Sequence, residues 1–171
     1  MKNKYEIHGD VAVIFLKRKD GTVMEALVDS ADIELLNTYK GTWHAHCDLK
    51  NNGCYARGCI FKGKIKSTIS MHRFLMNQPT GFMIDHINHN GLDNRRSVNL
   101  RIVSNSENQL NRKGVTRHSK SGLRNVYWNN TRSRWQAAIK KSGKVYYFGF
   151  YDDIHEASVA AENGRRSLID F

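Results

Sequence analysis

Proline is nearly absent from this chain, with one among 171 residues, and no stretch repeats a simple composition. These features exclude a collagen-like or low-complexity protein. Long hydrophobic runs are also missing, because the longest, residues 11–16, ends at once in Lys17, Arg18 and Lys19. A run of that length cannot span a bilayer. The N-terminus "MKNKYEIHGD" lacks the apolar core of a signal peptide, so we expect a cytoplasmic protein with no membrane partner.

Carboxylates are scarce: 16 Asp and Glu stand against 27 Lys and Arg, which gives a net charge of +11. The excess is uneven, at +4 for residues 1–111 and +7 for residues 112–171. A basic surface attracts polyanions by releasing their counterions, and the usual cytoplasmic polyanion is nucleic acid. A soluble basic protein without such a partner is the alternative. Hydrophobic residues make up 40% of the chain, which is enough to bury one or two small cores.

There are only three cysteines, Cys47, Cys54 and Cys59, and they lie near His44 and His46. An odd number in a cytoplasmic chain argues against a disulfide framework. Cys and His are ligands that zinc prefers, but the spacings C-x6-C and C-x4-C lack the short paired knuckles of structural zinc sites. We therefore expect buried packing cysteines and no structural zinc.

The first part of the chain reads as short strands, rich in β-branched and aromatic residues and bounded by Gly, Asp and Asn. The predicted strands cover residues 5–18, 22–29, 41–49, 54–62 and 64–72. A helix is predicted at residues 30–40, with Ser30 or Asp32 placed to cap it. Residues 70–78 fit either the end of a strand or a short helix.

The segment that follows predicts strand, loop, strand and helix in that order. The strands cover residues 82–88 and 99–104, and a turn-rich loop joins them. The helix follows directly, with Ser104 or Ser106 as its N-cap.

A basic linker at residues 112–120, with almost no apolar side chains, precedes the last part of the chain. That part predicts three strands, at residues 124–130, 134–141 and 144–151. An amphipathic helix follows over residues 152–169, with Asp152 or Asp153 as N-cap.

Asp85 and His86 stand side by side on the first predicted strand of the strand–loop–strand–helix segment. Neighbouring side chains on a strand point to opposite sides, so these two residues can have different roles. Histidine can take a proton from an attacking water, and a carboxylate can hold a hard divalent cation. The carbonyl of an Asn on the following helix can supply a second oxygen ligand. Together these groups have the chemistry needed to hydrolyse a phosphodiester.

The same segment resembles the HNH endonucleases, whose pattern runs Asp-His, Asn-x-x-Asp-Asn-Arg-Arg, Asn-Leu-Arg, Ser or Thr, and Glu-Asn-x-x-Asn. Here it reads Asp85-His86, Asn90-Gly91-Leu92-Asp93-Asn94-Arg95-Arg96, Asn99-Leu100-Arg101, Ser104 and Glu107-Asn108, with Asn111 completing it. The resemblance implies that His86 is the general base and Asp85 a metal ligand. It makes Asn99 the residue that pins the loop so that His86 stays aimed. Asn108, where many relatives have His, would be the second metal ligand.

This His-Asn-Asn variant is similar to the phage homing endonucleases, which use one Mg²⁺ or Mn²⁺ per active site. A simpler interpretation assigns most of the loop asparagines to turns and treats Arg95 and Arg96 as solvated. His89 is a weaker candidate base, because it falls within the loop. His72 stands where such proteins have a His-Arg pair, which implies packing or a phosphate contact for its side chain.

The C-terminal segment resembles the AP-two/ERF type of DNA-binding domain. The matching stretches are Ser121-Gly122-Leu123-Arg124-Asn125-Val126, Trp135-Gln136-Ala137-Ala138-Ile139, Phe148-Gly149-Phe150-Tyr151 and Glu156-Ala157-Ser158. Asn125 replaces the family's usual Gly, and Leu123 its usual Tyr. Strand alternation places one set of side chains on the helix and the other on an open face that can enter the major groove. The predicted DNA contacts are Arg95, Arg96 and Arg101 in the nuclease motif and Arg124, Arg132, Arg134, Gln136, Lys140 and Tyr147 in the C-terminal segment.

The sequence thus predicts an α+β protein with two domains. Residues 1–111 form a β-rich HNH nuclease domain whose ββα-metal motif spans about residues 82–112, and residues 121–171 form a three-stranded antiparallel sheet packed on one helix. The expected function is site-specific nicking or cutting of double-stranded DNA by a monomer, in the host cytoplasm if the gene is phage-encoded. The alternative is a non-catalytic DNA-binding regulator on a nuclease scaffold. A third interpretation, RNA binding, requires exposed stacking aromatics such as Tyr127, Trp128 and Tyr147.

Overall fold

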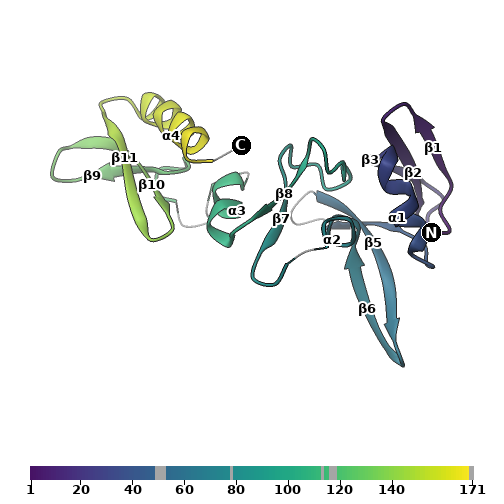
Figure 1. The fold of residues 1–171 in the computed structure, drawn as a ribbon. Helices are drawn as coiled ribbons and strands as arrows, with labels where there is room; N and C mark the ends of the chain where they lie inside the picture. Colours follow the sequence, from purple (N-terminus) through teal and green to yellow (C-terminus); the bar gives the residue numbers. More distant parts are fainter. Residues whose placement is uncertain (49–52, 78, 113, 116–118, 170–171) are drawn as a thin grey trace. The chain divides into compact units, whose positions relative to one another are not determined.

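The fold is that of a computed structural model, which describes residues 1–48, 53–77, 79–112, 114–115 and 119–169. The chain divides into two compact units, Met1–Val103 and Ser104–Phe171, each described here by itself. The described residues form four small antiparallel sheets and four α-helices, so the predicted α+β class is confirmed (Figure 1). Residues 113 and 116–118 of the predicted linker lie outside the described residues. No helix in the described part is long and apolar enough to cross a membrane.

The first unit begins with a sheet of three strands in the order β1-β2-β3. These are β1 (Tyr5–His8), β2 (Val11–Lys17) and β3 (Val23–Asp29). The alternation on β2 buries Ala12, Ile14 and Leu16 completely, and these side chains pack with Trp43 in the core of the unit. The single strand predicted at residues 5–18 is divided, because the chain turns at Gly9, whose φ is +61°.

A short helical segment follows the first sheet: a 3₁₀ turn, η1 (Ser30–Asp32), leads into α1 (Ile33–Thr38). The predicted side-chain cap by Ser30 or Asp32 is wrong, since neither side chain bonds a helix N–H. The Asp32 carboxylate is buried and accepts instead from the Arg96 guanidinium, with Nε 2.8 Å from Oδ2. The Asp32 carboxylate, which its position in the sequence suited to cap the helix, thus bonds a residue far away in the sequence instead.

The second sheet has the order β4-β5-β6, with β4 (His44–Asp48), β5 (Gly53–Lys62) and β6 (Ile65–Ser70). Cys47 and Cys54 are direct partners in the β4–β5 register and form a disulfide. The expectation that no disulfide forms is therefore wrong. The prediction failed because the number of cysteines does not report which residues face each other across a sheet. The antiparallel pairing of β4 and β5 places these two cysteines directly opposite each other. Cys59 is free.

The ambiguous segment at residues 70–78 contains a helix, α2 (Met71–Met76), so the strand predicted at residues 64–72 ends at Ser70. After α2 the chain forms a two-stranded sheet of β7 (Met83–His86) and β8 (Leu100–Val103). The loop between these strands, residues 87–99, is the turn-rich loop predicted from the sequence.

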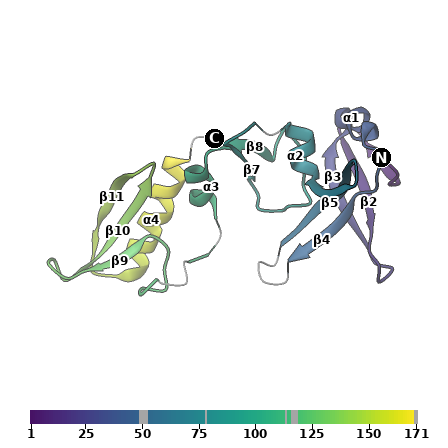
Figure 2. The ribbon, with the colours of Figure 1, turned by 90° about the horizontal axis from the view of Figure 1, so that it is seen from below.

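The second unit begins with α3 (Asn105–Asn111), which has Ser104 as its N-cap and a complete capping box with Glu107. Its sheet has the order β11-β10-β9, with β9 (Val126–Asn129), β10 (Arg134–Lys141) and β11 (Lys144–Tyr151). The last helix, α4 (Ile154–Leu168), is capped by Asp153, which accepts from two helix N–H groups. It lies against one face of this sheet (Figure 2), where Ala157 and Ala161 pack on Val126 and Ala137.

Candidate active site

Asp85 and His86 end strand β7, and both are buried, with 8% and 6% of their surface exposed. Strand β8 pairs with them directly: Asp85 is opposite Arg101, and His86 is opposite Leu100. The chain turns immediately after them, since the His89 N–H donates to the His86 carbonyl at 2.9 Å. The acidic and imidazole groups predicted to do the chemistry are thus fixed at the point where the strand meets the loop.

Asn94, from the loop, contacts the His86 ring. Its Oδ1 lies 3.4 Å from His86 Nε2, while its Nδ2 donates to the Leu92 carbonyl at 3.1 Å. The second bond fixes the orientation of the amide, so the atom facing His86 is an acceptor. Nε2 therefore carries the proton of the neutral ring, which leaves Nδ1 as its basic nitrogen. Asn94 itself is fully buried.

Two further rings pack against His86 and against each other. The His72 ring stands edge-on to it at 4.9 Å between centroids, and the Tyr55 ring lies at 5.8 Å. Gly91 allows the loop to pass here, because a Cβ at that position would lie 2.5 Å from both the Cys54 carbonyl oxygen and the Tyr55 ring. The aromatic neighbours restrict how the His86 ring can turn.

Burial sets the charge state of both histidines. It lowers the pKa of His72 to about 3, with a smaller effect from His86, Arg73 and Arg57. Burial also lowers the pKa of His86, against the opposing effects of the Asn94 hydrogen bond and the Asp85 and Asp93 carboxylates. His86 is therefore neutral at pH 7, which is the state that a general base requires.

Asn99 joins the two ends of the loop. Its Oδ1 accepts from the Asn88 N–H at 2.9 Å, and its Nδ2 donates to the Asp93 carbonyl at 2.6 Å. Asn99 is 2% exposed, so these bonds are shielded from water. Loss of this side chain would release Asn88, two residues after His86, and the segment that carries Asn94.

The loop is also attached to the first sheet. The Asn94 N–H donates to the Leu27 carbonyl at 2.7 Å, and Leu27 in turn donates to the Leu92 carbonyl at 2.9 Å. The Ser97 hydroxyl and N–H both donate to the Asp29 carboxylate, at 2.6 and 2.9 Å. Because β3 is part of the core of the unit, the loop that faces His86 is held by a rigid element.

The three arginines predicted to contact DNA in this motif are each paired with a carboxylate. Arg95 donates to both oxygens of Asp93, at 2.8 and 2.7 Å, and Arg101 donates through Nε and Nη2 to Asp85, at 3.1 and 2.8 Å. The third, Arg96, is the partner of Asp32. A phosphate would therefore have to share these guanidinium groups with buried acids or displace them.

The Asp85 carboxylate beside His86 is an oxygen ligand of the kind that hard divalent cations prefer. The described residues contain no group of three His, Cys, Asp or Glu side chains placed to hold a metal. A single carboxylate with an amide oxygen suits Mg²⁺ or Mn²⁺, which keep several water or phosphate oxygens as ligands. Asp85 belongs to the first unit, whereas Asn108 lies on α3 in the second.

In the C-terminal unit, four predicted DNA contacts lie along the side of the sheet that faces away from α4. Strand register places Gln136 beside Tyr127 and Phe150, and places Tyr147, which is 67% exposed, beside Ala138. These residues with Lys140 form the open face, and the Arg132 guanidinium lies 4.6 Å from the centre of the Phe150 ring. The four predicted contacts on this face are Arg132, Gln136, Lys140 and Tyr147.

The other two predicted contacts in this unit have protein partners. Arg134 pairs with Asp152 at 2.7 Å on the surface. Arg124 donates to carbonyl groups at the end of α3, to Gln109 at 2.5 Å, to Leu110 at 2.9 Å, and also to Arg112. Arg124 therefore acts as the C-terminal cap of α3.

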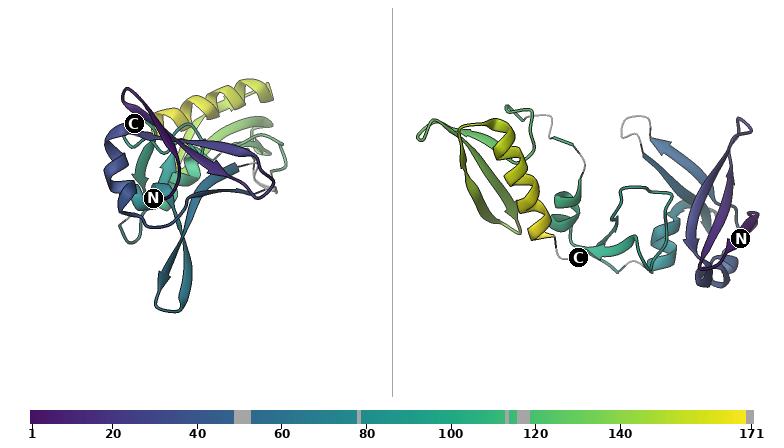
Figure 3. Two further views of the ribbon diagram at one scale, coloured as in Figure 1. Left: turned by 90° about the vertical axis from the view of Figure 1, so that its right-hand side faces the viewer. Right: turned by 90° about the horizontal axis from the view of Figure 1, so that it is seen from above.

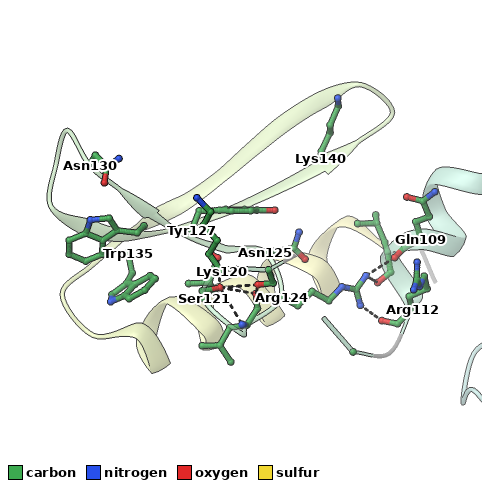
Figure 4. Close-up of a pocket in the computed structure, with 16 residues that line it drawn as sticks. Gln109, Arg112, Lys120, Ser121, Arg124, Asn125, Tyr127, Asn130, Trp135 and Lys140 are labelled. Carbon is green, nitrogen blue, oxygen red and sulfur yellow. Dashed lines mark hydrogen bonds between the residues drawn. The ribbon is translucent and has the colours of Figure 1, made fainter. Parts of the chain in front are cut away.

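A pocket of about 640 Å³ lies beside the Arg124 cap. Arg112 and Gln109 line one end and Trp135 the other, with Ser121 and Tyr127 between them (Figure 4). Ser121 donates to the Val126 carbonyl at 2.7 Å, which fixes this wall of the pocket.

Residues 77–110 match the family model described as HNH endonuclease, which supports a nuclease function and binding to DNA. The matched segment contains Asp85, His86, Asn99 and Asn108 and crosses the boundary between the two compact units. No curated protein and no solved structure matches the chain.

Sequence reasoning missed three neighbours of His86. Asn94 was counted among the turn residues, although it is fully buried and contacts His86, and Tyr55 was given no role beyond its place in the strand predicted at residues 54–62. His72 was singled out by its His-Arg pair, but nothing in the sequence placed it against His86. Of the three, only His72 was marked by a sequence pattern, its His-Arg pair. The ring contacts themselves could not be predicted, because they depend on how β5, α2 and β7 pack.

Proposed function

We propose that the protein is a metal-dependent DNA endonuclease of the phage homing type, with the His-Asn-Asn form of the HNH site. The observation that carries this proposal is the environment of His86: a buried, neutral imidazole whose proton is assigned to Nε2 by Asn94. The match of residues 77–110 to the HNH endonuclease model supports the same function.

In this mechanism His86 Nδ1 takes the proton of the attacking water. Asn99 holds the loop, and through it Asn94, so that the ring keeps one orientation while the proton moves. The His72 and Tyr55 rings pack against the His86 ring and against each other, which limits the access of water to that part of the imidazole. Asp85 and Asn108 would hold one Mg²⁺ or Mn²⁺, which when bound would stabilise charge on the phosphate and on the leaving oxygen.

The C-terminal unit is proposed to be an AP-two/ERF-like module that binds double-stranded DNA through the open face of its sheet. Arg132, Lys140 and Tyr147 are exposed there, which supports this assignment. The proposed functional domains are residues 1–111 and 121–171, joined by a linker at 112–120, in a cytoplasmic monomer; this division follows the HNH motif through α3, whereas the compact units divide before α3. Two tethered modules on one DNA gain affinity because the second contact is effectively intramolecular.

The proposal is tested by nicking of supercoiled DNA from the source genome at low salt, with Mg²⁺ or Mn²⁺. We expect cleavage by the wild type and its loss both with a chelator and in His86→Ala. The matched control is His8→Ala, which removes an exposed histidine of the same unit. Cleavage that survives in His86→Ala would exclude this residue as the base.

A DNA-binding regulator on a nuclease scaffold is the second candidate, favoured by the ion pair in which the Arg101 guanidinium neutralises the Asp85 carboxylate. It predicts that the wild type retards DNA in a gel but leaves it uncut under every metal condition. Nicking with either metal removes this alternative.

A further inference from the structure

Strands β5 and β6 extend beyond the body of the first unit as a two-stranded hairpin (Figures 1 and 3). We refer to its outer part, residues 60–68, as the hairpin arm. Every described side chain of the arm is exposed, on both faces of the ribbon. Isolated two-stranded ribbons are marginally stable in water, so an arm of this kind gains from a binding partner.

The arm carries large apolar side chains where a solvated ribbon would have polar ones. Phe61 is 69% exposed and Ile65 is 72% exposed, and both lie within two residues of Gly63 in the turn. Phe61 is the direct cross-strand partner of Lys66, so an aromatic ring and a cation share one face. Ile65 pairs with Lys62 and so points to the opposite face, which means that both faces of the arm present a large exposed apolar group.

Charge identifies the partner. Between Asp48 and Asp85 the sequence contains no Asp or Glu, while it contains six Lys and Arg. Lys64 lies in the turn of the arm and Lys66 beside it, and both are exposed. A surface with apolar groups, cations and no carboxylates fits a polyanion that also offers apolar edges.

We propose that the hairpin arm is a second DNA-contacting element, built into the nuclease unit and separate from the C-terminal sheet. A two-stranded β-ribbon has the dimensions to enter the major groove. In that position Lys64 and Lys66 contact phosphates, and Phe61 packs against sugar and base edges. The inference rests on the proposed function only in taking duplex DNA as the substrate.

The lysine contribution is tested by the salt dependence of binding to duplex DNA, measured by fluorescence anisotropy with a chelator present so that no cleavage occurs. Lys64→Ser with Lys66→Ser should weaken binding about tenfold and reduce the slope of log K against log salt by about 1.8, the value for two phosphate contacts. The control, Lys17→Ser with Lys19→Ser, removes equal charge near Asp20 in the other hairpin of the unit. Equal losses in both double variants would overturn the proposal.

The apolar contribution is tested by Phe61→Ala, which should weaken binding about fivefold and leave the salt slope unchanged. Ile7→Ala is the matched control, because Ile7 is 54% exposed on β1. Unchanged affinity in Phe61→Ala would overturn the apolar contact with DNA. If sedimentation then showed a changed oligomeric state in this variant, the arm would be assigned to protein association instead. DNA binding measured in a chelator does not depend on catalysis. A protein that binds DNA through the arm but does not nick it would therefore overturn the proposed nuclease function and leave the role of the arm intact.

Discussion

The Arg101 guanidinium is bonded to the Asp85 carboxylate, with Nη2 2.8 Å and Nε 3.1 Å from the same oxygen. Both side chains are largely buried, at 15% and 10% exposed. The residue expected to hold a metal and a residue expected to touch DNA are therefore partners in the folded protein. A cation arriving at Asp85 has to displace this guanidinium or share the carboxylate with it.

We predict that Arg101→Met destabilises the protein by about 3 kcal/mol in a chelator, because the buried carboxylate loses its guanidinium partner. Mg²⁺ or Mn²⁺ should then raise the melting temperature more in the variant than in the wild type, since the metal no longer competes with Arg101. Thermal unfolding with and without the metal measures both effects. Arg18→Met, which breaks only an exposed pair with Asp20, should change stability little. An Arg101→Met protein as stable as the wild type would show that the pair contributes nothing.

The buried His72 makes stability depend on pH. Its folded pKa is about 3 and the ordinary value is 6.5, so between these values the unfolded chain binds a proton that the folded protein does not. Stability should therefore fall as pH drops from 6.5 toward 3, by up to about 1.4 kcal/mol for each pH unit from this group. In His72→Gln that contribution is absent, so the free energy of unfolding should fall less steeply with acidification in the variant than in the wild type. Urea unfolding over this pH range measures both slopes. Parallel stability curves for the two proteins over this range would contradict the assignment.

Local sequence signals predicted the elements whose causes are local. The capping box at Ser104 and Glu107 and the Asp153 cap each depend on residues within one helical turn. The spacing of Asp85, His86, Asn99 and Asn108 likewise sufficed to select the segment that matches the HNH endonuclease model.

Partners distant in the sequence could not be read in the same way. Asp32 bonds Arg96, 64 residues away, and Arg124 bonds the carbonyl groups of α3. In both cases a charged residue that suited a cap or a DNA contact by its position is bonded to a different part of its unit instead. The Cys47–Cys54 disulfide depends on register, which neither spacing nor cysteine count reports.

Asn94 should control the basicity of His86. Its hydrogen bond raises the pKa of His86, so Asn94→Leu should lower that pKa, whereas Asn94→Asp adds a negative charge and should raise it. The acid limb of the activity profile would then move to higher pH in Asn94→Asp. Titration of the His86 ring by NMR measures both shifts, with His155 on the surface of α4 as the internal reference. Shifts of the same sign in the two variants would show that Asn94 acts through packing rather than through its bond to the ring.

Arg124 should determine the stability of α3, the helix that carries Asn108. Three carbonyl groups at the end of this helix accept from its guanidinium, and a cation there also interacts favourably with the helix dipole. Arg124→Ala should cost about 2 kcal/mol of local stability, seen as faster amide exchange in residues 108–111, with smaller changes in α4. Arg132→Ala removes an exposed arginine of the same unit and should leave this exchange unchanged while weakening DNA binding. If Arg124→Ala instead weakens DNA binding and leaves α3 protected, Arg124 is a DNA contact, as its position in the sequence predicted, and its bonds to α3 contribute little.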